Sequence, residues 1–365
     1  MKGLRFVVGT PAVALSLALV LLLAACGGAP AAPAAPAAPV AEAPAAPAAP
    51  VAEAPAAPAA EAVPVVADAA PILPSGNTAP PLDEVLVSTE WLAENLDNPA
   101  VRVIEVSVIP GVYERGHIPN AVNFVWHTDF VDTTNRDIVQ PEVFAELIQQ
   151  AGINSDTTVV LYGDNNNWFA AWGGWIFTLY GHADVRLLDG GRVKWEAEGR
   201  ELTTAVPTFP IGNATVEAAN PALRVGKNDV LSVVEGKSDA VIIDIRSPDE
   251  YNGVIFAPEG FQELAIRAGH IPGAVNVPWG KAVNQDTGEF KSADELRELY
   301  ASVGVDGSKP VIVYCRIGER ASHTWYALHN ILGYDVTMYD GSWTEWGNSV
   351  GVPIANPTGT IWGAQ

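Results

Sequence analysis

Short apolar runs alternate with amphipathic stretches from residue 83 to about residue 356. The clearest runs lie at residues 102–106, 159–162, 240–245 and 310–314, and they are rich in Val and Ile. Short, continuously apolar runs of this kind are typical of strands that are buried on both faces of a parallel sheet. Because helical patterns lie between the runs, we expect an α/β fold in which helices cover both faces of each sheet.

Two of the helix starts are marked by capping boxes. Residues 247–250 read Ser-Pro-Asp-Glu and residues 292–295 read Ser-Ala-Asp-Glu. Each combines a serine that caps the helix with a glutamate three residues later, and the first also has Pro at the first helical position. Both segments therefore predict helices that begin directly after the serine.

The folded part of the chain repeats itself. Four blocks recur in the same order, and order of this kind indicates an internal duplication. The matched pairs are 102–106 with 240–246, 116–123 with 269–276, 159–164 with 311–316, and 184–191 with 335–342. We therefore expect two tandem domains, at residues 82–205 and 220–356.

The N-terminal region is expected to direct export and to tether the protein. Residues 1–26 have Lys2 and Arg5 before a long apolar stretch, and the stretch ends in Leu-Ala-Ala-Cys. This ending resembles the bacterial lipobox, which implies lipidation at Cys26 and an extracytoplasmic protein held to the bacterial membrane. An uncleaved signal anchor is the alternative. Residues 27–81 form an Ala/Pro-rich tract that suits an extended spacer.

The charge of the chain restricts its partners. The formal net charge is −22, and the sequence contains no basic cluster, so nucleic acid is not an expected partner. An acidic surface would also repel anionic headgroups, so we expect the lipid rather than the surface to hold the protein to the membrane. We expect a monomer.

Cys315 is the candidate nucleophile. It follows the apolar run at 310–314 and precedes a helical pattern at 321–328, with Arg316 and Arg320 beside it. A cysteine between a strand and a helix faces backbone N–H groups and the positive end of the helix dipole, and both favour the thiolate. The two arginines would suit an anionic substrate. The structural alternative is an inert buried cysteine, which is common for free thiols.

At these residues the chain resembles the rhodanese family, in its tandem form of thiosulfate and 3-mercaptopyruvate sulfurtransferases. The resemblance rests on the paired Gly-His-Ile-Pro blocks at 116–119 and 269–272, the Asp-Ile-Arg-Ser-Pro segment at 244–248 and the loop that opens with Cys315. It implies a catalytic second domain and a first domain that has lost its cysteine, with Gly163 in its place. It also implies covalent sulfur transfer through a Cys315 persulfide, with no metal or organic cofactor.

The same resemblance implies which residues bind the substrate. A basic residue directly after the cysteine is typical of the members that use thiosulfate, so Arg316 points to that small anionic donor, with cyanide or a thiol as the thiophilic acceptor. Ile317 and Glu319 depart from the family loop. The implied substrate-binding residues are Arg316, Ile317, Gly318, Glu319, Arg320, Arg246 and, by a weaker match, Arg267. Arg246 could instead form a structural ion pair with Asp244.

Several alternatives stay open on the sequence. 3-Mercaptopyruvate could be the donor, or the chain could be a sulfane-sulfur carrier that does not turn over. A cysteine phosphatase or arsenate reductase of the same fold would need its arginine at the position of Ala321, one place after Arg320. His117 and His270 lie in Gly-His-Ile-Pro turns without a second ligand at metal spacing, so we expect no metal site. Trp279 could border the substrate pocket.

Overall fold

The computed structural model describes residues 80–262 and 264–362. Cys26, the signal segment and all but the last residues of the spacer lie outside the described residues, so the expectations of lipidation and export stay predictions. Within the described ranges, no helix is both long and apolar enough to cross a membrane.

The first half contains a five-stranded sheet in which every neighbouring pair is parallel. Its strand order is β1-β7-β6-β2-β3. The strands are β1 (Leu86–Val87), β2 (Val101–Glu105), β3 (Val122–Asn123), β6 (Thr158–Tyr162) and β7 (Val185–Leu188). The central strands β2 and β6 are almost completely buried, as their apolar runs predicted.

The second half repeats this sheet strand for strand. Its order is β8-β12-β11-β9-β10, and all its neighbours are parallel. The strands are β8 (Arg224–Val225), β9 (Val241–Asp244), β10 (Val275–Asn276), β11 (Val311–Tyr314) and β12 (Val336–Tyr339). The expected α/β fold and its duplication are therefore confirmed.

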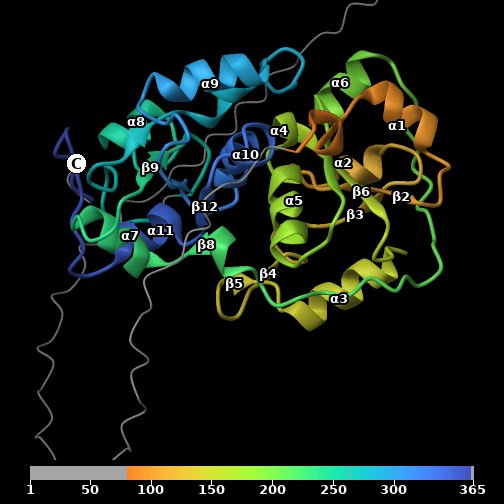
Figure 1. Cartoon of the computed structure of the whole chain (residues 1–365), viewed down its shortest axis with the longest axis horizontal. Helices are drawn as coiled ribbons and strands as arrows, with labels where there is room; N and C mark the ends of the chain where they lie inside the picture. Colours follow the sequence, from red (N-terminus) through yellow and green to blue (C-terminus); the bar gives the residue numbers. More distant parts are fainter. Residues whose placement is uncertain (1–79, 263, 363–365) are drawn as a thin grey trace, which may run out of the picture. The chain divides into compact units, whose positions relative to one another are not determined.

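Helices surround both sheets (Figure 1). The first half has η1 (Leu82–Glu84), α1 (Thr89–Asn95), α2 (Val112–Arg115), α3 (Pro141–Gln150), α4 (Asp164–Asn167), α5 (Ala170–Leu179) and α6 (Gly191–Ala197). The second has η2 (Pro221–Leu223), α7 (Lys227–Val234), α8 (Pro248–Asn252), η3 (Trp279–Ala282), α9 (Ala293–Ala301), α10 (Ala321–Tyr326), a π-helical turn η4 (Ala327–Ile331) and α11 (Ser342–Asn348). The capping boxes at Ser247 and Ser292 begin α8 and α9, as predicted.

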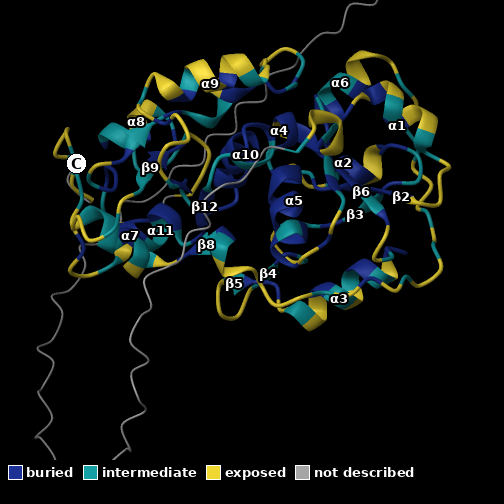
Figure 2. Cartoon of the chain, viewed as in Figure 1, coloured by how far each residue is buried: buried dark blue, intermediate teal, exposed yellow. Residues whose placement is uncertain are grey.

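The two halves meet along α5 and α10, which contact each other. Both helices are almost fully buried, as Figure 2 shows by their dark colour. The hydroxyl of Tyr326 donates a hydrogen bond to the carbonyl oxygen of Val85 across this interface, at 2.5 Å. A small antiparallel hairpin, β4 (Val131–Asp132) and β5 (Asp137–Ile138), extends from the first half and also contacts the second.

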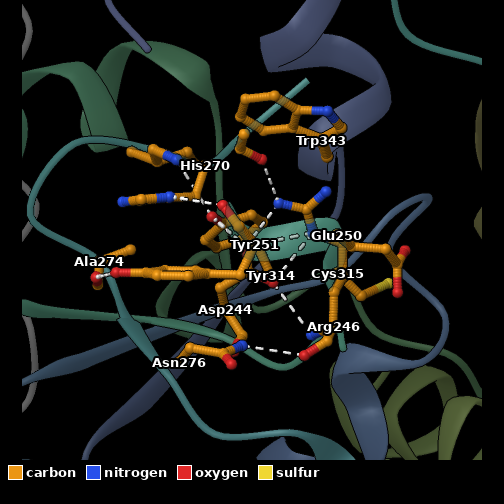
Figure 3. Close-up of polar contacts among 12 residues, drawn as sticks. Asp244, Arg246, Glu250, Tyr251, His270, Ala274, Asn276, Tyr314, Cys315 and Trp343 are labelled. Carbon is orange, nitrogen blue, oxygen red and sulfur yellow. Dashed lines mark hydrogen bonds and ion pairs between the residues drawn. The ribbon is translucent and has the colours of Figure 1, made fainter. Parts of the chain in front are cut away.

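Each half contains a buried acid that is paired with an arginine at the end of its central strands. In the first half, Tyr162 donates to Glu105 at 2.5 Å, and Arg192 of α6 pairs with Glu105 at 3.0 Å. In the second half, Tyr314 donates to Asp244 at 2.6 Å, and Arg246 pairs with the same carboxylate at 2.6 Å (Figure 3).

The two arginines come from different places in the repeat. By the aligned blocks, the counterpart of Arg192 is Trp343, and the counterpart of Arg246 is Ser107, which donates to Glu105 at 2.7 Å. The Arg246 guanidinium lies over the Trp343 ring, 4.7 Å from its centroid. A cation therefore reaches the buried acid in both halves, by two different routes.

We expect Arg192→Met to destabilise the first half strongly. Glu105 is 0% exposed on its side chain, and burial already raises its pKa, against the hydrogen bond from Tyr162 and the charge of Arg192. Removal of one partner of a buried ion pair typically costs about 3–5 kcal/mol. Urea unfolding followed by tryptophan fluorescence measures the loss.

The control is Arg297→Met in α9, because Arg297 and its partner Asp294 are 51% and 96% exposed on their side chains. That exposed pair should contribute no more than about 0.5 kcal/mol. Equal losses of unfolding free energy in the two variants would show that the buried pair stabilises the protein no more than the exposed pair does.

Candidate active site

Cys315 lies at the carboxyl end of β11, where ligand sites form in open parallel sheets. Its side chain is fully buried and free of any disulfide. The N–H of Gly318 donates to the Cys315 sulfur at 3.1 Å. The Cys315 backbone is itself held by the loop after β12, because its N–H donates to Ser342 Oγ at 3.1 Å and its carbonyl accepts from the Trp343 N–H at 3.0 Å. The thiol therefore sits in a fixed backbone turn.

Gly318 is required by the shape of this turn. Its φ is +105°, in the region that favours glycine. A Cβ atom at this position would also lie 2.4 Å from Oδ1 and 2.5 Å from the carbonyl oxygen of Asp340. A larger residue here would thus change the turn that places an N–H on the sulfur.

Two guanidinium groups border the loop. Arg316 donates to the Gln262 carbonyl at 2.6 Å and lies over the Phe261 ring. Arg320 is buried, pairs with Glu250 at 3.0 Å and lies over the Trp168 ring. Burial lowers the pKa of Arg316, and the charge of Arg320 lowers it further. An anion bound beside these two cations would relieve that repulsion.

A small pocket of about 140 Å³ opens between the loop and the first half. Its walls are mostly apolar, and both halves contribute to them. The first half supplies Val108, Trp126, Trp168 and Phe169, and the second supplies Pro258, Phe261, Arg316, Ile317 and Arg320. The aromatic residues of the first half were not singled out from the sequence. Trp279, which was named from the sequence as a possible border of the pocket, stacks on Trp168 with ring centroids 5.2 Å apart.

Arg246 forms the structural ion pair with Asp244 that the sequence offered as the alternative to substrate binding. Its side chain is 1% exposed, and it binds both carboxylate oxygens of Asp244 and the Gly269 carbonyl, the last at 2.7 Å. Burial disfavours its charge, but Asp244 raises its pKa above the ordinary value. With 1% of its side chain exposed, Arg246 presents almost no surface to a donor.

Arg267 is engaged in the same way, by the end of α11. Its three guanidinium nitrogens donate to four backbone carbonyls at 2.6 to 2.9 Å. The acceptors are Trp346, Gly347, Ser349 and Val352. Arg267 thus fixes the C-terminal end of α11, and its proposed contact with a donor stays untested.

In the first half, the residue after Gly163 binds the segment that follows β2. The Asp164 carboxylate accepts from the N–H groups of Val108 at 2.6 Å and Ile109 at 3.0 Å. At the position that matches Cys315, a Cβ on Gly163 would lie 2.2 Å from the Val106 carbonyl oxygen. A cysteine therefore does not fit at Gly163 without backbone movement, and a carboxylate already occupies the neighbouring donors.

The histidines of the two Gly-His-Ile-Pro turns have a structural environment. The Nδ1 atom of His117 lies 2.9 Å from the Tyr113 carbonyl, and that of His270 lies 2.7 Å from the Tyr251 carbonyl. Each imidazole also stacks on the ring of the same tyrosine. Across the described ranges, no group of three His, Cys, Asp or Glu residues is placed to hold a metal ion.

Glu319 is the unusual residue of the loop. Its Oε2 atom is buried and has no hydrogen-bond partner within the described residues. Burial, and then the charge of Asp340, raises its pKa from 4.5 to about 8. Burial thus favours the neutral form of the Glu319 carboxyl in the folded protein, which lessens the negative charge that this residue adds to the loop.

We expect Glu319→Gln to stabilise the protein more at pH 8 than at pH 5. The unfolded carboxyl loses its proton near pH 4.5 and the folded one near pH 8, so unfolding releases a proton between these values and stability falls as the pH rises through that window. Glutamine cannot release this proton. Thermal unfolding of both proteins at the two pH values tests this, and a difference that does not change with pH would contradict the raised pKa.

Comparison with known proteins matches this architecture. The model of the Rhodanese-like domain matches the chain twice, at residues 88–198 and 228–349. The crystal structure of SseA from Escherichia coli, a 3-mercaptopyruvate sulfotransferase, superposes with a TM-score of 0.61 at 32% identity, over 71% of this chain and 98% of that one.

Curated relatives are closer in sequence. The chain is 54% identical over 278 residues to the sulfur carrier protein TtuD of Thermus thermophilus, which covers 74% of this chain and 96% of that protein. It is 49% identical over 277 residues to a Saccharopolyspora erythraea protein named "Putative thiosulfate sulfurtransferase", over 75% and 97% of the two chains. Two matched domains and this degree of identity show that the chain belongs to the rhodanese family of sulfurtransferases.

Proposed function

We propose that this protein is a thiosulfate sulfurtransferase that carries sulfur on Cys315. The observation that carries the proposal is the hydrogen bond from the Gly318 N–H to the Cys315 sulfur, beside a pocket that Arg316 and Arg320 border. A backbone donor aimed at the sulfur stabilises the negative charge that a thiolate or a persulfide bears. The membership in a family of sulfurtransferases agrees with this chemistry.

The reaction has two sulfur transfers. In the first, the Cys315 thiolate attacks the outer sulfur of thiosulfate, an S–S bond to Sγ forms, and the S–S bond of thiosulfate breaks so that sulfite leaves with the electron pair. In the second, the acceptor attacks the outer sulfur of the persulfide and the Cys315 thiolate leaves. Cyanide becomes thiocyanate, and a thiolate becomes a persulfide. Both steps conserve charge and need no added oxidant.

The charge of the pocket favours an inorganic dianion as the donor. Arg316 and Arg320 both line it, and the mutual repulsion that lowers the pKa of Arg316 would decrease when an anion binds. Because burial raises the pKa of Glu319 and favours its neutral form, this residue offsets less of the positive charge than an exposed carboxylate would. The mostly apolar walls lower the local dielectric constant and so strengthen charge-assisted hydrogen bonds inside the pocket.

Two alternatives are supported by specific relatives. The similarity to SseA supports 3-mercaptopyruvate as the donor. The similarity to TtuD, named a sulfur carrier protein, supports a chain that hands its sulfur to a partner rather than to a small acceptor. Turnover rates measured with thiosulfate and with 3-mercaptopyruvate show which of the two is the donor. Repeated turnover with cyanide separates the second, because a carrier would accept one sulfur per chain and stop.

We also propose that the protein works outside the cytoplasm, as a monomer held to the membrane through lipidated Cys26. The lipobox at the end of the signal-like segment supports this placement. The tract at residues 27–81 would then act as a spacer between the lipid and the two domains.

We expect Cys315→Ser to abolish sulfur transfer, because a serine hydroxyl cannot form a persulfide. Wild-type protein incubated with thiosulfate should gain one sulfur atom on the peptide that contains Cys315, seen by mass spectrometry. Cys26→Ser is the matched control, since it changes the only other cysteine of the chain, and its domains should keep full turnover. Turnover by Cys315→Ser would refute the proposal.

We expect Arg316→Gly to lower the catalytic efficiency with thiosulfate by roughly ten- to a hundredfold, the usual effect of losing a charge-assisted hydrogen bond of about 1.5–3 kcal/mol. The efficiency with 3-mercaptopyruvate should fall less, because that donor carries one charge fewer. The measured quantity is the ratio of the two kcat/KM values.

Arg297→Gly controls for the loss of one positive charge, because Arg297 is exposed on α9 and lies outside the pocket. Its ratio should equal that of the wild type. A wild-type preference for mercaptopyruvate, or a ratio that Arg316→Gly leaves unchanged, would show that Arg316 does not select the donor.

A further inference from the structure

One hydrogen bond joins the first half directly to the loop of Cys315. The Nη2 atom of Arg136, in the β4–β5 hairpin, lies 2.8 Å from the carbonyl oxygen of Ile317. This carbonyl belongs to the same peptide group as the Gly318 N–H, which donates to the Cys315 sulfur at 3.1 Å. The peptide group thus lies between a cation on one side and the sulfur on the other.

We propose that Arg136 is a positioning residue for the active-site thiol. The proposal rests on Cys315 as the sulfur-accepting residue. The peptide between Ile317 and Gly318 is trans, as are all described peptide bonds, so its C=O and N–H point in opposite directions. A donor that binds the carbonyl therefore fixes the direction of the N–H and polarises it, which strengthens its hydrogen bond to a negative sulfur.

Arg136 follows a hydrogen-bonded turn in the hairpin. Asp132 accepts from the N–H groups of Thr134 and Asn135, which closes the turn. Arg136 itself has a φ of +53°, unusual for a residue with a side chain. Such conformations persist where surrounding contacts enforce them, often at functional sites.

A second contact links the hairpin to Asp340, which lies against Gly318. Arg224 of β8 bridges Asp137 of the hairpin, at 2.5 Å, and Asp340 at the end of β12, at 2.7 Å. Asp340 is the residue that a Cβ on Gly318 would strike. The hairpin is therefore linked to the Ile317 carbonyl through Arg136 and to the neighbour of Gly318 through Arg224. Among the described residues, Arg136 is the one whose side chain binds the peptide that contacts the sulfur.

Arg136 lies outside the pocket that Arg316 and Arg320 line. It lines a separate hollow of about 550 Å³ with Asp340 and Thr344. It is not among the residues that line the pocket with Arg316 and Arg320. Its effect should thus fall on the reactivity of the sulfur and not on the affinity for the donor.

The first test separates these two effects in Arg136→Met, which keeps the apolar stem and removes the donors. We expect the rate of Cys315 sulfur loading at saturating thiosulfate to fall about three- to thirtyfold, with KM changed by less than about twofold. Arg136→Lys, which keeps a charged donor, should stay within about threefold of the wild type. Thr134→Ala, on the same exposed turn, should match the wild type.

The second test needs no sulfur donor. Cys315 is alkylated with iodoacetamide, a neutral reagent, over a range of pH. In Arg136→Met the pH of half-maximal alkylation should move upward by roughly half to one unit, because the anionic sulfur has lost support. The shift should persist in about 1 M salt, which screens exposed charges beyond about 3 Å but does not replace a direct hydrogen bond.

These results would overturn the proposal: a loading rate and alkylation profile of Arg136→Met equal to those of the wild type, a raised KM with an unchanged loading rate, or a shift that salt removes. The last two would mean that Arg136 acts only as a charge. If wild-type protein is not loaded by thiosulfate while the alkylation profile still shifts, the proposed function fails and the positioning role of Arg136 stands. If Arg136→Met does not fold, Arg136→Asn provides the same two readouts, because asparagine tolerates the positive φ of this position and its side chain is too short to reach the Ile317 carbonyl.

Discussion

The hydrogen bond from the Gly318 N–H to the Cys315 sulfur depends on a backbone turn that only glycine can adopt at this site. Gly318 has a φ of +105°, and Asp340 lies so close to it that there is no room for a side chain. The carbonyl of the same peptide is bound by Arg136 from the first half. A peptide held at both ends gives the sulfur a fixed donor without any reorganisation during the reaction, which is how preorganised sites stabilise negative charge.

This arrangement explains why a half without a nucleophile stays part of the site. The counterpart of the cysteine is Gly163, whose position has no room for a Cβ, and the Asp164 carboxylate occupies the backbone donors nearby. The first half nevertheless supplies Trp168 to the pocket wall and Arg136 to the loop. The two copies therefore have different roles: the second half holds the thiol, and the first half supplies contacts around it.

The sequence could predict the sheets and the cysteine loop, because apolar runs and repeated blocks report local backbone structure. The partners of the loop could not be predicted in this way. Arg136 lies 181 residues before the carbonyl it binds, so only the folded chain brings them together. Arg246 shows the opposite limit: an arginine two residues after an aspartate suits either a substrate or an ion pair, and its side-chain exposure of 1% distinguishes them only once the fold is known.

We propose that Cys315 holds the transferred sulfur against the Gly318 N–H, beside the pocket that both halves line. A crystal structure of the protein after incubation with thiosulfate tests it most directly. We expect one added sulfur atom bonded to Cys315 Sγ, within hydrogen-bonding distance of the Gly318 N–H and directed toward Arg316. An unmodified Cys315 in crystals of protein that turns over thiosulfate, or sulfur bound at another residue, would contradict it.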